Sequence, residues 1–196
     1  MNKLKTTLAL IVFAIAGIQY TAGQEIADFS YVPNASYPFG RYNPEAPSQL
    51  LDFDPLIGIC DCQSVARNPD GTWQDTTVMI WKFKYIMNGW AVQDETFRDG
   101  FFATGIRQVN PDSAKWTVTY SSSNSAPYTV PVWVGDKKDG NIVLYRDQVA
   151  PNGMVGYYKI TFFDISSAGF NWKGEWVNAD ESIVFPTWHI ICDKRT

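Results

Sequence analysis

Histidine and cysteine are scarce in this 196-residue chain, which holds one His, His189, and three Cys. A mechanism that needs two histidines is therefore excluded, and so is a disulfide-rich miniprotein, which would be shorter and richer in Cys. Charged residues make up only 18% of the chain and aromatic residues 15%, whereas disordered chains are rich in charge and poor in aromatics. The 14 Gly and 11 Pro are close to ordinary usage, which excludes collagen-like and low-complexity classes. The length fits one domain.

Extended basic patches are also missing. Lys and Arg occur only in short pairs such as Lys137-Lys138 and Lys194-Arg195, and the formal net charge is −4. Because binding to nucleic-acid phosphates requires a patch of Lys and Arg, we expect no nucleic-acid partner.

The first 23 residues have the three-part pattern of a secretory signal peptide. Lys3 and Lys5 form a positive region, residues 8–18 are uncharged and apolar, and Thr21-Ala22-Gly23 offers small residues at a cleavage site before Gln24. An uncleaved anchor would need about 20 apolar residues. The sequence therefore predicts a secreted or periplasmic protein with no integral membrane segment after the signal at 1–23 is removed.

Residues 24–49 form a segment of different composition, with prolines interleaved with the aromatics Tyr31, Tyr37, Phe39 and Tyr42. A plain linker would be less aromatic, so we expect part of this N-terminal arm to pack on the domain at 50–196. The stretch from Ser48 to Phe53 predicts a short helical turn that ends at Pro55.

Turn signals such as Asn88-Gly89 and Asp99-Gly100 recur from residue 56 onward, between runs rich in Val, Ile, Thr and aromatics. Within the run at 77–87, alternate residues from Met79 to Met87 are apolar, whereas Lys82 and Lys84 lie on the opposite face. This pattern predicts an all-β meander. Closing the sheet removes its exposed edges, which favours an antiparallel up-and-down barrel of 8–10 strands over a sandwich. Such a barrel is filled by side chains or holds one small ligand.

Two stretches resemble a known family. Leu56-Ile57-Gly58-Ile59-Cys60 resembles the opening of lipocalin-like (calycin) barrels, and residues 86–95 resemble a hairpin of an uncharacterised family of secreted bacterial lipocalin-like domains. The resemblance covers about residues 50–194. Cys60 stands where the family has the Trp that plugs the barrel base, so the plug does not carry over. The resemblance implies a lipocalin-like barrel and a cavity, and no reaction.

The three cysteines suggest a bridge across the barrel seam. Cys60 and Cys62 share one face of a strand with side chains about 7 Å apart, too far for an easy mutual bond. Cys192 lies on the last strand, which neighbours the first in a closed meander, so a disulfide from Cys192 to Cys60 or Cys62 is expected. A rival interpretation is a zinc site that adds His189, but residues 189 and 192 face opposite sides of a regular strand, so it needs a bulge.

Two further residues carry candidate chemistry. His189 on a late strand suits a haem ligand, although a hydrogen-bonded His among strand neighbours is the commoner arrangement. Glu95, if it faces inward, would have a raised pKa and serve as an acid or base, although an exposed strand position is the commoner case. Nucleophilic hydrolysis is disfavoured because the Gly-x-Ser-x-Gly motif is missing.

The favoured function is non-catalytic binding of a small, mostly apolar molecule in the barrel cavity, with no metal or cofactor. The alternatives are an enzyme that uses Glu95 or His189, and a carbohydrate-binding module that uses surface aromatics such as Trp73 and Trp133. An Arg beside an internal Glu would anchor a polar ligand group. The candidate ligand-binding residues are Met79, Trp81, Phe83, Tyr85, Glu95, Arg107, Trp116, Tyr120, Arg146, Trp172 and His189.

Overall fold

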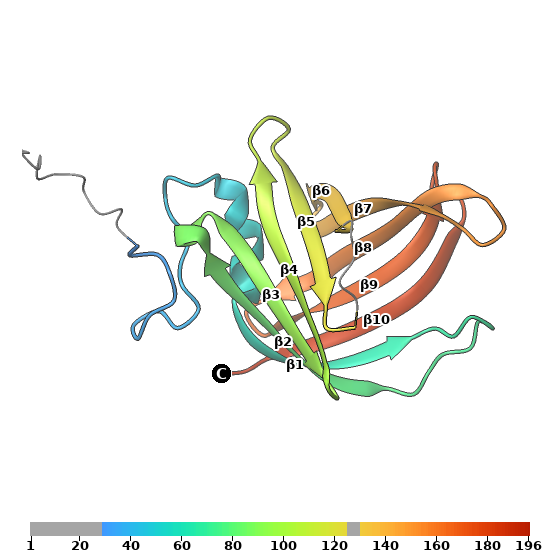
Figure 1. Cartoon of the computed structure of the whole chain (residues 1–196), viewed down its shortest axis with the longest axis horizontal. Coiled ribbons are helices and arrows are strands. Elements are labelled where there is room, and N and C mark those ends of the chain that lie inside the picture. The colour runs from blue at the N-terminus through green and yellow to red at the C-terminus, as the bar shows by residue number, and fades with distance from the viewer. Residues whose placement is uncertain (1–28, 125–129) are drawn as a thin grey trace, which may run out of the picture.

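The computed structural model describes residues 29–124 and 130–196, so the expected signal peptide at 1–23 lies outside the described residues. In the described part, ten antiparallel strands close into one barrel in which each strand pairs with its sequence neighbours and the first pairs with the last (Figure 1). The strands are β1 (Gly58–Ala66), β2 (Thr77–Ile86), β3 (Ala91–Arg98), β4 (Phe101–Asn110), β5 (Lys115–Ser122), β6 (Val132–Lys138), β7 (Asn141–Val149), β8 (Val155–Ser166), β9 (Gly169–Asn178) and β10 (Val184–Lys194). The predicted up-and-down barrel is confirmed.

Alternation along the strands explains which residues fill the interior. In β2, Met79, Trp81, Phe83 and Tyr85 are buried inside the barrel, and the intervening residues, the two lysines included, are partly exposed on its outside. A closed sheet has no unpaired edge, and its inner face collects the apolar side chains of every strand. The predicted alternation of β2 is therefore correct.

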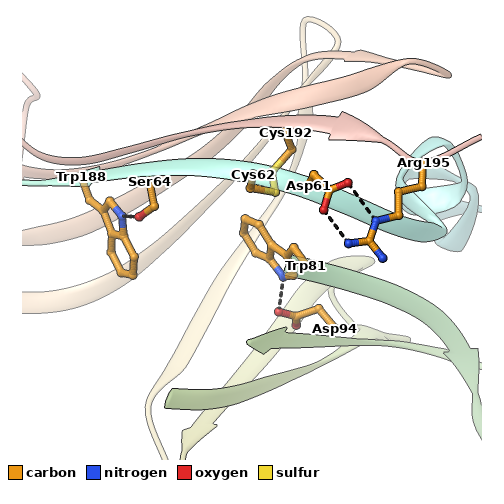
Figure 2. Close-up of a disulfide and its surroundings, with 8 residues drawn as sticks. All are labelled: Asp61, Cys62, Ser64, Trp81, Asp94, Trp188, Cys192 and Arg195. Carbon is orange, nitrogen blue, oxygen red and sulfur yellow. Dashed lines mark hydrogen bonds and ion pairs between the residues drawn. A yellow bond between two sulfur atoms is a disulfide. The ribbon is translucent and has the colours of Figure 1, made fainter. Parts of the chain in front are cut away.

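The barrel seam between β1 and β10 is closed by hydrogen bonds and by one disulfide (Figure 2). Cys62 and Cys192 lie directly opposite each other in the register, with Cα atoms 4.1 Å apart, and they are bonded. Cys60 is a buried free thiol paired in register with Lys194. The expected seam disulfide is confirmed, and the structure selects Cys62 over Cys60.

One end of the barrel is filled by the 3-10 helix η1 (Ser48–Leu56), whose Leu50, Phe53 and Leu56 are fully buried. The Phe53 ring lies edge-on to the rings of Trp116 and Phe162, at centroid distances of 4.8 and 5.5 Å. The helix also continues through Pro55. The Ile57 N–H donates to the Asp54 carbonyl at its C-terminal end, so the helix ends at Leu56 and not at the predicted Pro55.

The described part of the arm packs at this same end, beside the short 3-10 turn η2 (Met87–Gly89) that joins β2 to β3 (Figure 1). The Tyr85 N–H donates to the Phe39 carbonyl at 2.8 Å. The Arg41 guanidinium lies 4.8 and 4.6 Å from the ring centroids of Tyr31 and Tyr37. The backbone of Phe39 therefore attaches the arm to β2, whereas the contacts of Arg41 with Tyr31 and Tyr37 lie within the arm. No helix in residues 29–124 and 130–196 is long and apolar enough to cross a membrane.

Candidate functional site: a cavity in the open half of the barrel

The half of the barrel opposite η1 contains a cavity of about 340 Å³. Its wall is formed mainly by aromatic and aliphatic side chains with a few polar groups among them, which is the composition of small-molecule pockets. The volume lies at the lower end of the range of about 300–1,000 Å³ that such pockets occupy. Six of the eleven candidate residues line it: Met79, Trp81, Arg107, Tyr120, Arg146 and Trp172.

Three candidates face inward but do not reach the cavity. Phe83, Tyr85 and Trp116 are at most 1% exposed and lie at the filled end of the barrel. The Tyr85 hydroxyl donates to Asp54 at 2.9 Å and the Trp116 indole N–H donates to Asp52 at 3.1 Å. Their assignment as ligand-binding residues is therefore wrong for this cavity, because η1 occupies the space in front of them.

Glu95 lies on the outer face of β3, the exposed strand position expected as the commoner case, so it lacks the inward placement that a catalytic acid or base requires. Its carboxylate contacts Lys82 Nζ at 2.5 Å and Lys84 Nζ at 3.2 Å, both from the neighbouring strand β2. The hydrogen bond from Lys82, together with the weaker one from Lys84, holds the pKa of Glu95 below its usual range. Glu95 is an ionised surface partner of two lysines.

His189 also lies outside the barrel, because its strand neighbours Ile190 and Cys192 set the inward face of β10 at this point. Its ring centroid is 5.0 Å from that of the exposed Trp73. A bulge does occur in β10, but it falls between Pro186 and Trp188 and leaves residues 189 and 192 on opposite faces.

These placements separate the groups that a metal or haem site would require. Cys62 and Cys192 are joined to each other, and His189 points away from the interior. Within the described ranges, no cluster of three or more His, Cys, Asp or Glu side chains is arranged to hold a metal ion. The residues therefore fit neither the zinc arrangement nor a haem bound inside the barrel through His189.

The floor of the cavity holds a buried polar group that the sequence analysis missed. Asp94 accepts a hydrogen bond from the Trp81 indole N–H at 2.7 Å (Figure 2) and forms an ion pair with Arg107. The Asp94 and Arg107 side chains are only 6% and 4% exposed. The guanidinium also lies 5.1 and 5.2 Å from the ring centroids of Phe53 and Phe83, so it separates the cavity from the filled half.

The hairpin register contains the signal that would have identified Asp94. The turn at Asn88-Gly89 brings Tyr85 opposite Val92 and Phe83 opposite Asp94. Directly opposed residues of an antiparallel pair point to the same face of the sheet. Since Phe83 was predicted to point inward, Asp94 rather than Glu95 follows as the internal carboxylate.

The wall above the floor carries a second arginine, Arg146 of β7. Its guanidinium carbon lies 4.4 Å from the ring centroid of Trp133 and 5.8 Å from that of Tyr158. Trp133 is 8% exposed and lines the cavity, so its interpretation as a surface aromatic is wrong. Burial raises the pKa of Tyr158 and of Tyr120, which keeps both phenols protonated as hydrogen-bond donors at neutral pH.

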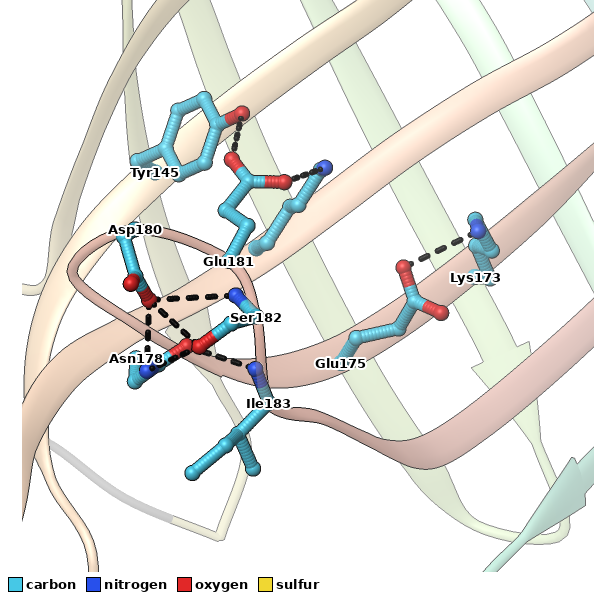
Figure 3. Close-up of polar contacts among 9 residues, drawn as sticks. Tyr145, Lys173, Glu175, Asn178, Asp180, Glu181, Ser182 and Ile183 are labelled. Carbon is cyan, nitrogen blue, oxygen red and sulfur yellow. Dashed lines mark hydrogen bonds and ion pairs between the residues drawn. The ribbon is translucent and has the colours of Figure 1, made fainter.

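A separate polar cluster lies on the outside of the barrel, where the loop between β9 and β10 folds back over β7 and β8 (Figure 3). Glu181 of this loop accepts a hydrogen bond from the Tyr145 hydroxyl at 2.7 Å and pairs with Lys159 Nζ at 2.5 Å. Within the loop, the Asn178 side chain accepts from the Ile183 N–H and donates to Asp180. This cluster orders the loop and contributes nothing to the cavity wall.

Among the solved structures that resemble this chain, Rv2717c from M. tuberculosis is 12% identical, with 78% of this chain and 100% of that chain covered and a TM-score of 0.52. A protein of unknown function of the DUF3598 family from Nostoc punctiforme is 8% identical, with 76% of this chain and 100% of that chain covered and a TM-score of 0.25. No protein-family model matches the chain, and no curated protein matches it. The likeness to Rv2717c concerns the barrel fold alone.

Proposed function

We propose that this protein is a secreted, lipocalin-like binding protein that holds a small, mostly apolar molecule in its barrel without transforming it. The observation that carries the proposal is the cavity of about 340 Å³, walled by aromatic and aliphatic side chains inside a closed sheet. The signal-peptide pattern at 1–23 and the seam disulfide both suit an oxidising compartment outside the cytoplasm.

The apolar wall sets the scale of the binding free energy. Removing apolar surface from water yields about 25 cal/mol per Å², so a ligand that buries about 400 Å² gains about 10 kcal/mol. Association costs at least about 4 kcal/mol of this gain, so we expect affinities in the micromolar range. Met79, Trp81 and Trp172 are among the apolar side chains of the wall, and the rigid aromatic rings lose little conformational freedom on binding.

The positions of the two candidate acid–base residues support binding over catalysis. Glu95 and His189 are both on the outer face, and the internal carboxylate, Asp94, is engaged by Arg107 and Trp81. A general acid or base must come within hydrogen-bond reach of the reacting group. Neither of the side chains proposed for that role reaches a molecule in the cavity.

The test is a fluorescence titration with N-phenyl-1-naphthylamine, an uncharged apolar dye that brightens on leaving water. The cavity is blocked by Ala103→Trp, which places an indole in it from β4. The matched control is Gln108→Trp, which adds the same side chain on the exposed outer face of the same strand. We expect micromolar binding to the wild type and to the control, and at least about tenfold weaker binding to the blocked variant. Equal binding to all three proteins, or to none, contradicts the proposal.

A further inference from the structure

The charges that line the cavity do not balance. The charged side chains of its described wall are Asp94, Arg107 and Arg146. The first two neutralise each other through their buried ion pair. Arg146 forms no salt bridge or hydrogen bond with any residue in the described ranges, so it leaves a net positive charge inside a chain whose formal net charge is −4.

Arg146 contacts two aromatic rings, which stabilise its positive charge but do not neutralise it. The rings of Trp133 and Tyr158 lie near the guanidinium, at 4.4 and 5.8 Å from its carbon. Contact with aromatic faces stabilises a cation, and it leaves the five in-plane N–H donors of the guanidinium uncommitted. The indole N–H of Trp133 is likewise buried with no acceptor in the described part of the chain. Two groups of donors therefore face the same region, and neither has an acceptor within the described ranges.

A half-buried cation without a counter-ion is unfavourable unless something supplies the missing charge. Two other cations of the structure have an acidic partner, since Arg107 pairs with Asp94 and Lys159 pairs with Glu181. Arg146 instead faces the barrel cavity, whose described wall is mainly apolar. The register places it beyond the filled end, because Ile142 and Leu144 of the same strand are fully buried and Arg146 follows them toward the open half.

We propose that the ligand is amphipathic, with an apolar body in the cavity and one anionic group, of the carboxylate or sulfonate class, bound by Arg146. This inference rests on the proposed function and specifies its ligand class. The anionic oxygens accept hydrogen bonds from the guanidinium edge, and the apolar body lies against Trp81 and Trp172. The Asp94–Arg107 pair forms a neutral floor beneath the apolar body.

The test compares two dyes with one aromatic skeleton. N-phenyl-1-naphthylamine is neutral, and 8-anilinonaphthalene-1-sulfonate carries one added sulfonate. Both are titrated into wild type, into Arg146→Gln, and into Arg41→Gln, which removes the same charge from an arginine of the arm, at the filled end of the barrel. A hydrogen-bonded charge contact corresponds to about a tenfold change in affinity or more. We therefore expect Arg146→Gln to weaken the anionic dye at least about fivefold more than the neutral dye.

The outcomes separate the two proposals. The anionic subsite is refuted, and the apolar binding function stands, if the neutral dye binds in the cavity but Arg146→Gln weakens the anionic dye less than about fivefold more than the neutral dye. It is also refuted if Arg146→Gln weakens the anionic dye by no more than Arg41→Gln does. If neither dye binds, the binding function itself is refuted. If Arg146→Gln does not fold, salt titration of the wild type decides: added NaCl must weaken the anionic dye and not the neutral one, and equal responses overturn the inference.

Discussion

Neutralising Asp94 at the cavity floor tests whether the Asp94–Arg107 pair is as buried as the structure places it. In the wild type, the Trp81 indole N–H donates to the Asp94 carboxylate at 2.7 Å. Asp94→Asn keeps an oxygen that can accept this hydrogen bond and removes only the negative charge. Arg107 then becomes an uncompensated cation whose side chain is 4% exposed. Breaking a buried pair in this way costs about 3–5 kcal/mol. That loss is a large fraction of the about 5–15 kcal/mol that stabilises an ordinary domain.

The assay is urea unfolding of the purified protein followed by Trp fluorescence, with thermal unfolding as a second probe. The loss corresponds to a fall in Tm of about 6–20 °C for a domain of this size. The double variant Asp94→Asn/Arg107→Met removes the orphaned charge, so we expect it to be more stable than Asp94→Asn alone. A loss below about 1 kcal/mol in the single variant, or a double variant less stable than the single one, refutes the placement of a buried ion pair at this site.

Three further predictions concern the cysteines and Glu95. Reducing the Cys62–Cys192 disulfide, which spans a sequence separation of 130, should lower the free energy of unfolding by about 2–5 kcal/mol. Urea unfolding with and without a phosphine reductant measures this, and a decrease under about 1 kcal/mol contradicts the prediction. Burial raises the pKa of Cys60 to about 11, so the thiol of the native protein should resist iodoacetamide at pH 8 and react only after unfolding. Mass spectrometry after alkylation checks this, and alkylation of Cys60 in the native protein refutes it. Because the pKa of Glu95 is lowered, its ion pairs stabilise the fold at pH values above the ordinary glutamate pKa, and this stabilisation is lost as the pH falls through the lowered pKa. The contribution is small, because the side chain is 40% exposed and solvent screens its charge. Glu95→Gln should therefore cost less than about 1 kcal/mol near neutral pH and leave dye affinity unchanged, and a loss of binding would restore a role at the site.

The sequence predicted which side chains point into the barrel better than it predicted how far along the barrel axis each one lies. Trp81 and Phe83 were both expected to point inward, and both do, yet only Trp81 reaches the cavity. Period-two alternation reports which face a side chain occupies. It carries no information about which end of the barrel is filled by another segment. The entry of η1, whose Phe53 packs against Trp116, depends on long-range packing that no local pattern encodes.

Polar residues were harder to predict than apolar ones because alternation alone leaves their face ambiguous. Asp94 and Glu95 are adjacent acids, and the choice between them depends on cross-strand pairing rather than on the strand itself. The same limit applied to Cys60 and Cys62, which share a face and differ only in which one lies opposite Cys192. In both cases the missing information is the register, which a tight hairpin turn can supply for β2 and β3 but which the distant strands β1 and β10 acquire only when the barrel closes.

The division of the barrel into a filled half and a hollow half also explains where function resides. Phe53 and its aromatic neighbours form the interior of one half, so the sheet of the other half does not need a complete core to remain closed. Arg107 lies between the two halves and has its charge satisfied locally by Asp94, so the floor presents no net charge to a guest. Arg146 is left as the one wall cation in the described residues without an acidic partner, and the affinity for an anionic guest therefore depends on it.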